Sequence, residues 1–306
     1  MPLMMSRRRF LLSSVGLALS TPLSARAVSN GGLRIGLLAD AQYADQLPAR
    51  TRFYRASLRK LQEAISRFDE EDLDLCINLG DLVDKDWNSF QPVLKAVNGA
   101  RQRFYHVLGN HDFDVAADYK KRVPERLGMA RRYYAISRGR FCFVVLDTTD
   151  ISPYTHPDSS PEHRSAMTLL ERIRKTGALN AEPWNGAISD RQLKWLETTC
   201  QKASKAGQSV IVFAHHPVFP ENVHNLWNAQ DVLGVVKRRR NIVAWFNGHN
   251  HSGGFGEFEG VPFVTLKGMV ETESSNAFCL ARLDGGGIVL DGCGREVSRR
   301  LKFRNP

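Results

Sequence analysis

Ile35-Gly36-Leu37-Leu38-Ala39-Asp40-Ala41-Gln42 is an apolar run that ends abruptly in polar side chains. The same order occurs four more times along the chain, and the five polar islands are Asp40-Ala41-Gln42, Gly80-Asp81-Leu82-Val83-Asp84, Gly109-Asn110-His111-Asp112, His215-His216-Pro217 and Gly248-His249-Asn250-His251. They follow apolar runs at 35–39, 75–79, 104–108, 210–214 and 242–246. Strands of a parallel sheet are buried on both faces, so they read as continuous apolar runs, and ligands gather at their carboxyl ends. The five islands therefore predict a metal site assembled from the whole sheet.

The composition is that of an ordinary globular protein. The chain has 306 residues, of which 42% are apolar and 24% charged, and this length can bury a sizeable core. The formal charge of +10 falls to +6 without the four arginines of residues 1–27, a segment that contains no acid. Such moderate basicity suits a small anionic substrate, and we expect no nucleic-acid polymer as partner. The basic run Lys237-Arg238-Arg239-Arg240 is interpreted as a helix end before the next strand, with a nucleic-acid patch as the alternative.

Residues 1–27 are expected to be a targeting segment. Ser6-Arg7-Arg8-Arg9-Phe10-Leu11-Leu12 resembles the twin-arginine export signal, and Ala25-Arg26-Ala27 offers small residues for cleavage. The apolar stretch between them is shorter than the roughly 20 residues that span a bilayer. We therefore predict an exported, periplasmic protein that starts near Val28, uses the twin-arginine translocation machinery and has no transmembrane anchor in its mature form. An uncleaved amphipathic anchor is the alternative.

Strand-like and helix-like stretches alternate through residues 28–306, which predicts one α/β domain. The expected helices are 51–68, 89–99, about 167–174 and one opening at Ser189, and the further strands are 141–146, 263–266, 277–282 and 288–290. The segment from Thr148 to Ala187 is long, polar and rich in proline, as lids and binding loops are. The five cysteines have no CxxC spacing, so no disulfide framework is expected, although a single bridge stays open.

The polar islands combine carboxylate, amide and imidazole groups and contain no cysteine. Taken singly, each is also a good turn or capping sequence. Structural zinc sites use cysteine, whereas this mixed set suits a pair of ions such as Mn²⁺ or Fe²⁺. The joint pattern therefore favours a two-metal site over turn chemistry alone.

The motif order D-x-(H or Q), GD-x-x-D, GNH(D or E), H and GH-x-H, spread from Leu33 to Leu283, resembles the calcineurin-like metallophosphoesterase superfamily. This resemblance implies a four-layer αββα sandwich with two mixed sheets and a dinuclear metal centre. It assigns Asp40, Gln42 and His251 to the first metal, Asn110, His215 and His249 to the second, and Asp81 to both. Two ions about 3.5–4 Å apart can share a hydroxide that attacks a phosphoryl group.

The same resemblance implies that His111 is the general acid and that Asp84 orients it. A capping or salt-bridge role is the alternative for Asp84. We expect His216 to lie behind the ligands or at the surface, and His106 to be a core histidine. His156, His163 and His224 receive no role.

Gln42 stands where the commonest superfamily pattern has histidine, which favours Mn²⁺ or Mg²⁺ over zinc. The residues around it narrow the resemblance to the manganese-dependent ADP-ribose/CDP-alcohol diphosphatase branch. The matching stretches are 39–45, 52–55, 146–152, 185–187, 227–228 and 260–272. The resemblance implies hydrolysis of phosphoanhydride or phosphodiester bonds in small nucleotide-like substrates. Tyr43 and Tyr54 are candidates to stack on a base and Arg55 to bind phosphate, with core packing and a helix-surface charge as alternatives.

Other functions on the same scaffold are a periplasmic phosphomonoesterase and a cyclic-nucleotide phosphodiesterase. A third alternative is a metal-binding interaction module without catalysis. The complete motif set argues against that module, because such a protein has no chemical reason to keep His111.

Overall fold

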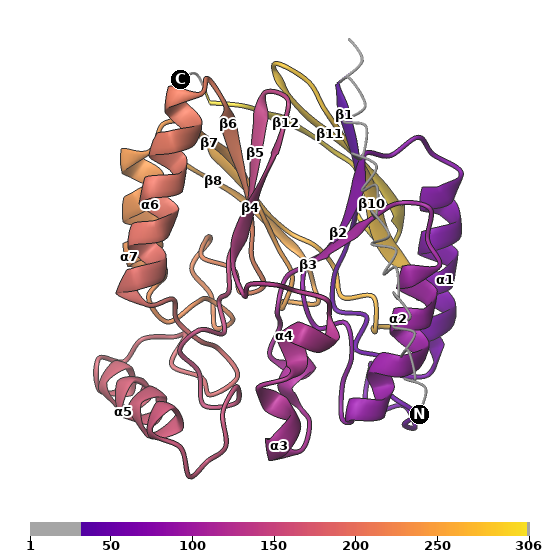
Figure 1. The fold of residues 1–306 in the computed structure, drawn as a ribbon, viewed down its shortest axis with the longest axis vertical. Helices are drawn as coiled ribbons and strands as arrows, with labels where there is room; N and C mark the ends of the chain where they lie inside the picture. The colour runs from indigo at the N-terminus through magenta and orange to yellow at the C-terminus, as the bar shows by residue number, and fades with distance from the viewer. Residues whose placement is uncertain (1–31, 305–306) are drawn as a thin grey trace, which may run out of the picture.

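Strand β1 (Leu33–Leu38) lies inside the first of two mixed sheets in the computed structural model, which describes residues 32–304 (Figure 1). The order of this sheet is β12-β11-β10-β1-β2-β3. Strands β1, β2 (Leu75–Asn78) and β3 (Phe104–His106) are parallel, whereas β10 (Ala277–Leu283), β11 (Gly287–Gly294) and β12 (Arg299–Lys302) pair antiparallel. The predicted targeting segment, residues 1–27, lies outside the described residues.

The second sheet has the order β4-β5-β6-β7-β9-β8. Its parallel centre consists of β5 (Phe141–Val145), β6 (Ser209–Phe213), β7 (Ile242–Asn247) and β9 (Val261–Thr265). The outer strands β4 (Tyr134–Arg138) and β8 (Gly254–Phe258) are antiparallel to their neighbours. Each sheet therefore has parallel strands whose carboxyl ends point toward the same end of the molecule.

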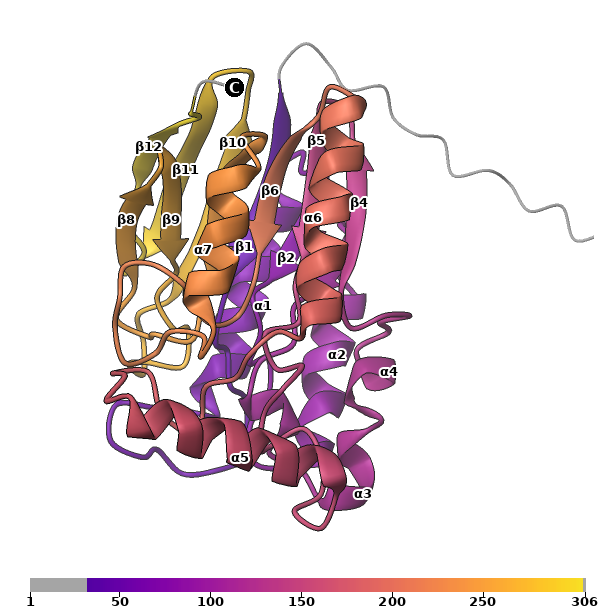
Figure 2. The same cartoon turned by 90° about the vertical axis from the view of Figure 1, so that its left-hand side faces the viewer.

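Helices cover the outer face of both sheets. Helices α1 (Ala56–Asp69) and α2 (Phe90–Asn98) pack on the first sheet, and α6 (Asp190–Lys205) and α7 (Ala229–Arg238) on the second. Figure 2 shows α6 and α7 side by side over their sheet, with α5 (Pro161–Lys175) lying across one end of it. The predicted four-layer αββα architecture is confirmed. No helix within 32–304 combines the length and the apolar character needed to cross a bilayer.

Successive side chains of β1 point to opposite faces of the first sheet, and this explains why the sheet is covered on both faces. Leu33, Ile35 and Leu37 face the core between the sheets, while Leu38 packs in the cluster under α1 and α2. Apolar residues of α1 recur at helical spacing, and its Phe68 meets Phe278 of β10 edge to face at 5.4 Å between ring centroids. These contacts fix the first sheet between two apolar layers, which leaves the strand ends as the place for polar residues.

Several boundaries differ from the sequence-based expectation. The helix expected from Thr51 begins at Ala56, because Phe53 N–H bonds Val270 O and Arg52 bridges to Glu271 instead of starting a turn of helix. Strands β4, β8 and β12 were not expected, since edge strands carry polar or glycine-rich sequences. Helix α7 was anticipated only by its basic end, which the structure confirms at Arg238.

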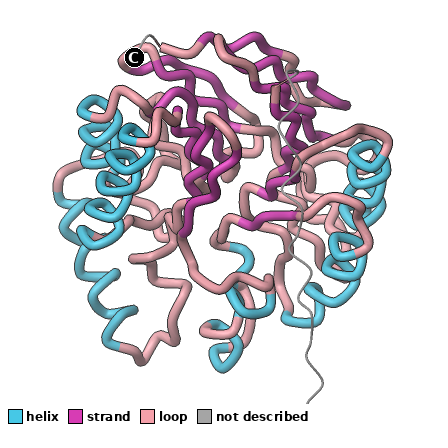
Figure 3. Tube along the Cα trace, turned by 45° about the horizontal axis from the view of Figure 1, so that its top comes forward, coloured by secondary structure: helices cyan, strands magenta, loops and turns pink. Residues whose placement is uncertain are grey.

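The remaining connections form one end of the molecule. Short helices α3 (Ala117–Lys120) and α4 (Val123–Arg126), the turns η1 (Trp87–Ser89) and η2 (His111–Phe113), and the segment 148–187 around α5 lie there. Figure 3 shows these loops gathered below the strand ends. We call residues 148–187 the cap segment. All five cysteines are free, and four of them are buried.

Candidate metal centre

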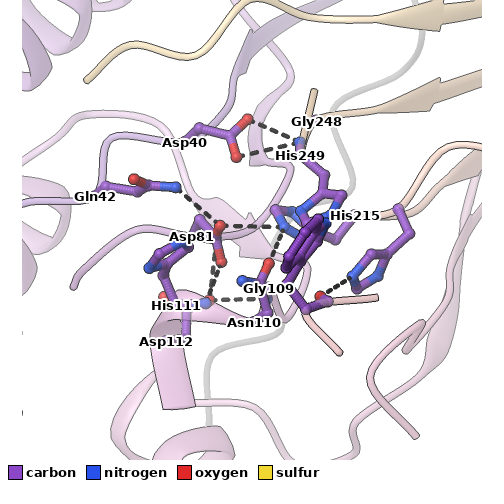
Figure 4. A network of polar contacts seen from close by, with 12 residues as sticks. Asp40, Gln42, Asp81, Gly109, Asn110, His111, Asp112, His215, Gly248 and His249 are labelled. Carbon is purple, nitrogen blue, oxygen red and sulfur yellow. Dashed lines mark hydrogen bonds and ion pairs between the residues drawn. The ribbon is translucent and has the colours of Figure 1, made fainter. Parts of the chain in front are cut away.

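The five polar islands meet at the carboxyl ends of β1, β2, β3, β6 and β7 (Figure 4). Backbone bonds join successive islands: Gln42 N–H donates to Asp81 O at 2.8 Å, and Gly248 N–H to His215 O at 3.1 Å. The N–H of His249 reaches across the two sheets to the carboxylate of Asp40, at 3.1 and 3.2 Å from its two oxygens. The residues expected to bind metal are therefore brought together by the backbone itself.

Four of these residues adopt left-handed backbone conformations that non-glycine residues rarely use. The φ angles are 54° at Asp40, 44° at Gln42, 53° at Asp81 and 69° at His249. Each conformation costs of order 1–3 kcal/mol and persists only where the surrounding structure imposes it. The sharp turn sends each side chain back across the strand ends, so strain is concentrated where the predicted ligands lie.

Two motif glycines make room for the carboxylates. A Cβ on Gly109 would lie 2.1 Å from Asp81 Oδ1, and one on Gly248 would lie 2.5 Å from Asp40 Oδ2. Any side chain at these positions would displace a predicted ligand. The glycines of the GNH and GH motifs are thus required for space at the site.

The carboxylate of Asp112 holds two of the loops in register. Its Oδ1 accepts the N–H groups of Leu82 and Val83 at 2.8 and 3.3 Å, and its Oδ2 those of Asp81 and Gly109 at 3.1 and 2.9 Å. Burial and the neighbouring Asp81 raise the pKa of Asp112 to about 7. Four N–H donors nevertheless match the two oxygens of the ionised form, which alone can accept all of them.

Asp81 is the centre of the cluster. Its Oδ2 lies 3.2 Å from His215 Nε2 and 3.1 Å from Gln42 Nε2. Asn110 Oδ1 lies 3.1 Å from the same His215 nitrogen. On the other side, His251 Nε2 is 3.5 Å from Asp40 Oδ1 and 3.0 Å from Gln42 Nε2. Asp81 therefore stands between two groups of potential ligand atoms, as a bridging carboxylate must.

Each of the three predicted histidine ligands has its second ring nitrogen engaged. His215 Nδ1 bonds Leu79 O at 2.8 Å, and His251 Nδ1 bonds Glu271 at 2.7 Å. His249 Nε2 bonds Asn185 Oδ1 at 2.9 Å. Metal-binding histidines are oriented in this way by a partner behind the ring. The arrangement leaves one nitrogen of each ring for an ion.

The electrostatics of the buried cluster divide the histidines into two kinds. Burial disfavours charge on His215, but Asp81 outweighs it and raises the pKa of His215 to about 9. The pKa of His251 is likewise raised to about 9 against burial, by hydrogen bonds to Asp40 and Glu271. Burial and the surrounding histidines lower the pKa of His249 well below its usual value. Asp81 is buried too, yet His215 and His111 lower its pKa.

The donor set fits a pair of divalent cations. Two groups of three side chains bring their potential ligand atoms within 4.8 Å of one another. They are Asp40, Asp81 and His215, and His215, His216 and His249. Gln42 Oε1 is buried without a hydrogen-bond partner. Rotation of that amide by half a turn would direct Oε1 toward Asp81 and His251, where an ion could use it. Carboxylate, amide and imidazole ligands are those that Mn²⁺ and Fe²⁺ accept.

His111 and Asp84 lie next to the predicted metal ligands. His111 Nδ1 is 2.9 Å from Asp84 Oδ1, and its Nε2 is 3.2 Å from Arg52 Nη1. Because the guanidinium can only donate, Nε2 is here the acceptor and Nδ1–H the donor to Asp84. The ring therefore presents its Nε2 to the guanidinium of Arg52.

A cavity of about 460 Å³ has Arg52, the partner of this nitrogen, in its wall. It is lined by Ala49, Arg50, Thr51, Arg52, Tyr54, His224, His249, Asn250, His251, Ser252 and Glu271. Of the three candidate substrate residues, only Tyr54 lines this cavity. Tyr43 packs against the core cluster under α1 and α2, and Arg55 is exposed and paired with Asp45.

Several residues were not anticipated by the sequence analysis. His216 is buried, which excludes the surface and leaves the first of its two expected places, behind the predicted ligands: its Nδ1 lies 2.8 Å from Thr148 Oγ1 and its Nε2 3.2 Å from Trp184 O. His224, which received no role, lines the cavity. His106 is buried as expected, and burial lowers its pKa to about 4.

Asn185, Arg52 and Glu271 stood in stretches that matched the diphosphatase branch, but no role was assigned to them. Their position in those stretches was the only clue. No local pattern marked any of them as a partner of the histidines.

Comparison with known proteins agrees with this geometry. A family model described as calcineurin-like phosphoesterase matches residues 33–253. Proteins named manganese-dependent ADP-ribose/CDP-alcohol diphosphatase are similar to the chain. The one from Bos taurus is 29% identical, covering 88% of this chain and 94% of its own length. The one from Arabidopsis thaliana is 30% identical, with coverages of 77% and 86%. A solved dimetal phosphatase from Danio rerio superposes with a TM-score of 0.80 at 26% identity, covering 90% of this chain and all of that one.

Divalent-cation affinity should depend on pH because His215 and His251 hold protons in the metal-free protein. Since both pKa values are raised to about 9, each ring must lose a proton when it binds an ion below that pH. Affinity at each site should therefore rise about tenfold per pH unit between pH 7 and 9 and level off above. Mn²⁺ titration of metal-free protein by calorimetry measures this slope.

The variant Glu271→Gln tests whether the pH dependence at one site comes from His251. Removing the carboxylate behind His251 should lower the pKa of that ring and shift the levelling of one site to lower pH. Glu257→Gln, at an exposed position of β8, is the matched control and should leave the profile unchanged. An affinity that does not change between pH 7 and 9 in the unmodified protein would contradict the assignment.

Asp112→Asn should weaken both folding and metal binding. The amide keeps one acceptor oxygen and turns an NH₂ group toward two of the four N–H groups, at a cost of about 1–3 kcal/mol for each. Urea unfolding in chelator should report this loss, and Mn²⁺ titration a weaker site. The exposed Asp118→Asn removes the same charge and should change neither. Equal stability of the two variants would show that Asp112 does not hold the loops.

Proposed function

The chain belongs to the calcineurin-like phosphoesterase family, and we propose that it hydrolyses the phosphoanhydride bond of a nucleoside diphosphate linked to a sugar or an alcohol. It is a metal-dependent phosphoric ester hydrolase. The observation that carries the proposal is the His111–Asp84 pair at 2.9 Å beside a complete ligand set. The substrate class is supported by relatives named for ADP-ribose and CDP-alcohols that cover most of the chain.

We propose Mn²⁺ as the resident ion. Asp40, Gln42 and His251 would hold the first ion, Asn110, His215 and His249 the second, and Asp81 both. When bound, two such ions supply a water of lowered pKa and an electrophilic clamp for the phosphoryl oxygens. Gln42 offers a neutral oxygen, which suits a harder ion than zinc.

Proton transfer to the leaving oxygen is the work of His111. Asp84 accepts the Nδ1–H of this ring at 2.9 Å, so Nε2 faces Arg52, a residue of the cavity wall. In hydrolysis the bond from phosphorus to the bridging oxygen breaks and water supplies the new oxygen. Nε2 of His111 is an unprotonated acceptor in the structure, so the ring must first take up a proton there, and the imidazolium paired with Asp84 can then protonate the departing group. Arg52 now contacts that nitrogen and can turn to a phosphate when an anion enters.

The cavity that Arg52 lines suits a charged substrate with a planar group. Arg50 and Arg52 line it together with the buried Tyr54. The two guanidinium groups can pair with a diphosphate, and the tyrosine ring can contact a base or sugar. Arg55 is bound to Asp45 at 2.6 Å and is therefore a poorer phosphate ligand than Arg52.

We further propose that the protein is exported by the twin-arginine machinery and acts in the periplasm. The sequence of residues 1–27 carries this proposal alone. Fractionation of cells expressing the full chain, with Arg7 and Arg8 replaced by Lys as control, would test it. Recovery of the unmodified chain only from the cytoplasm would contradict it.

A panel of substrates tests the reaction. With Mn²⁺, the protein should convert ADP-ribose to AMP and ribose phosphate, or CDP-choline to CMP and phosphocholine, detected by ³¹P NMR. Cyclic AMP, AMP and a nitrophenyl phosphodiester represent the cyclic-nucleotide phosphodiesterase and phosphomonoesterase alternatives. Asp81→Asn excludes a contaminating activity. Turnover of AMP to phosphate without anhydride cleavage would favour the phosphomonoesterase, and no turnover at all would favour a binding module.

His111→Ala should reduce turnover by an amount that depends on the leaving group. A general acid usually contributes about 10²–10⁴-fold. A phosphate monoester, whose second pKa is about 6, departs without full protonation, so the loss should be near the low end for an anhydride. It should be near the high end for a diester with an alkoxide leaving group.

Metal content of His111→Ala should equal that of the unmodified protein, because the ring is not among the proposed ligands. His156→Ala replaces a half-buried histidine of the cap segment and serves as the control. Equal losses on anhydride and alkoxide substrates would remove His111 from protonation of the leaving oxygen.

A further inference from the structure

Asn185 is a buried amide of the cap segment that reaches the proposed metal centre. Its side chain has no exposed surface. Its Oδ1 lies 2.9 Å from His249 Nε2, although 64 residues separate the two in the chain. The next residue, Gly186, is held by an N–H from Trp227 at 2.7 Å. The amide is thus carried by an ordered turn between α5 and α6.

The orientation of this amide is determined by its other contacts. Asn185 Nδ2 donates to Asn180 O at 3.0 Å and to Val223 O at 2.8 Å. Both partners are carbonyl oxygens, which only accept, so the nitrogen must face them and the oxygen must face His249. His249 Nε2 therefore carries the hydrogen, and the lone pair is on Nδ1.

The other predicted histidine ligands are held differently. Leu79 O, the partner of His215, directly follows β2 of the first sheet, and Glu271, the partner of His251, follows β9. The partner of His249 alone among the three comes from the cap segment. His216, next to a ligand, also bonds this segment through Trp184 O at 3.2 Å. The cap segment therefore contacts the centre through His249 and the neighbouring His216.

We propose that Asn185 is a positioning residue that fixes the tautomer of His249 and thereby couples the cap segment to the second metal ion. The inference rests on the proposed dinuclear centre. Binding of an ion through His249 Nδ1 strengthens the hydrogen bond from Nε2–H to Asn185 and so stabilises the observed position of the cap segment. By reciprocity, loss of this contact with the cap segment lowers the affinity for that ion by the same factor. The affinity for the ion held through His251 does not change.

Three variants of the full chain test this coupling. Asn185→Leu keeps the size of the side chain and removes the hydrogen bond. Asn185→Asp keeps an acceptor oxygen for His249. Asn180→Ala removes another amide of the cap segment, which donates to Leu226 O at 2.7 Å and does not contact His249. Thermal melting of the metal-free proteins checks that all three fold.

The first measurement needs no metal. Histidine ¹⁵N NMR of the metal-free protein should show His249 as the Nε2–H tautomer in the unmodified chain, in Asn185→Asp and in Asn180→Ala. In Asn185→Leu both tautomers should appear. A pure Nε2–H tautomer in Asn185→Leu would overturn the proposal.

The second measurement separates the two ions. Calorimetric titration with Mn²⁺ should show that Asn185→Leu loses about 10–100-fold in affinity for one ion and none for the other. Hydrogen exchange of residues 180–187 should slow on Mn²⁺ addition in the unmodified chain and in Asn180→Ala, but not in Asn185→Leu. An equal loss of affinity for both ions, or no loss for either, would overturn the coupling.

The proposed reaction can fail independently of this inference. If the unmodified protein binds two ions and shows the expected tautomer but cleaves no phosphoanhydride, the substrate proposal is wrong and the positioning role stands. If it cleaves the anhydride while Asn185→Leu binds both ions normally, the reaction stands and the positioning role is wrong.

Discussion

The carboxylate of Asp112 joins the loop after β2 to the loop after β3 through four backbone N–H groups, and the geometry of the centre depends on that junction. One loop carries Asp81 and the other carries Asn110 and His111. His111 N–H in turn donates to Asp81 Oδ1 at 2.7 Å. Because Asp81 stands between the two groups of potential ligand atoms, a shift of either loop would change the distances from Asp81 to both groups. A side chain with no catalytic task thus sets the positions of those that have one.

Strain and charge are both concentrated around this junction. Asp81 is left-handed at φ 53° and fully buried, so it carries a backbone cost and a desolvation cost together. Protonated His215 at 3.2 Å offsets the second cost, which is why the pKa of this histidine rises. Proton and cation are alternatives for the same place, since each supplies positive charge beside Asp81. The site is therefore already assembled before an ion enters, and the ion replaces protons in a rigid frame.

The sequence predicted the parts of the site that have local patterns. Each island follows its own apolar strand, so the predicted ligands could be found without knowledge of the fold. The partners behind the rings could not, because Glu271 and Asn185 lie 20 and 64 residues from the histidines they contact. Arg55 became a candidate phosphate ligand because it lies in a stretch that resembles the diphosphatase branch. In the structure its neighbour Arg52, in the turn before α1, contacts His111 instead.

The predicted metal site and the wall of the cavity are built from different parts of the chain. The predicted metal ligands stand at strand ends, which two packed sheets hold rigidly, while the cavity wall comes from loops around residues 49–54, 224 and 250–252. Loops of this kind can change length or sequence without moving the strand ends. His249 belongs to both regions, since its ring lines the cavity and faces Asn185 of the cap segment. A change at Asn185 would therefore act on a residue that belongs both to the cavity wall and to the predicted metal site.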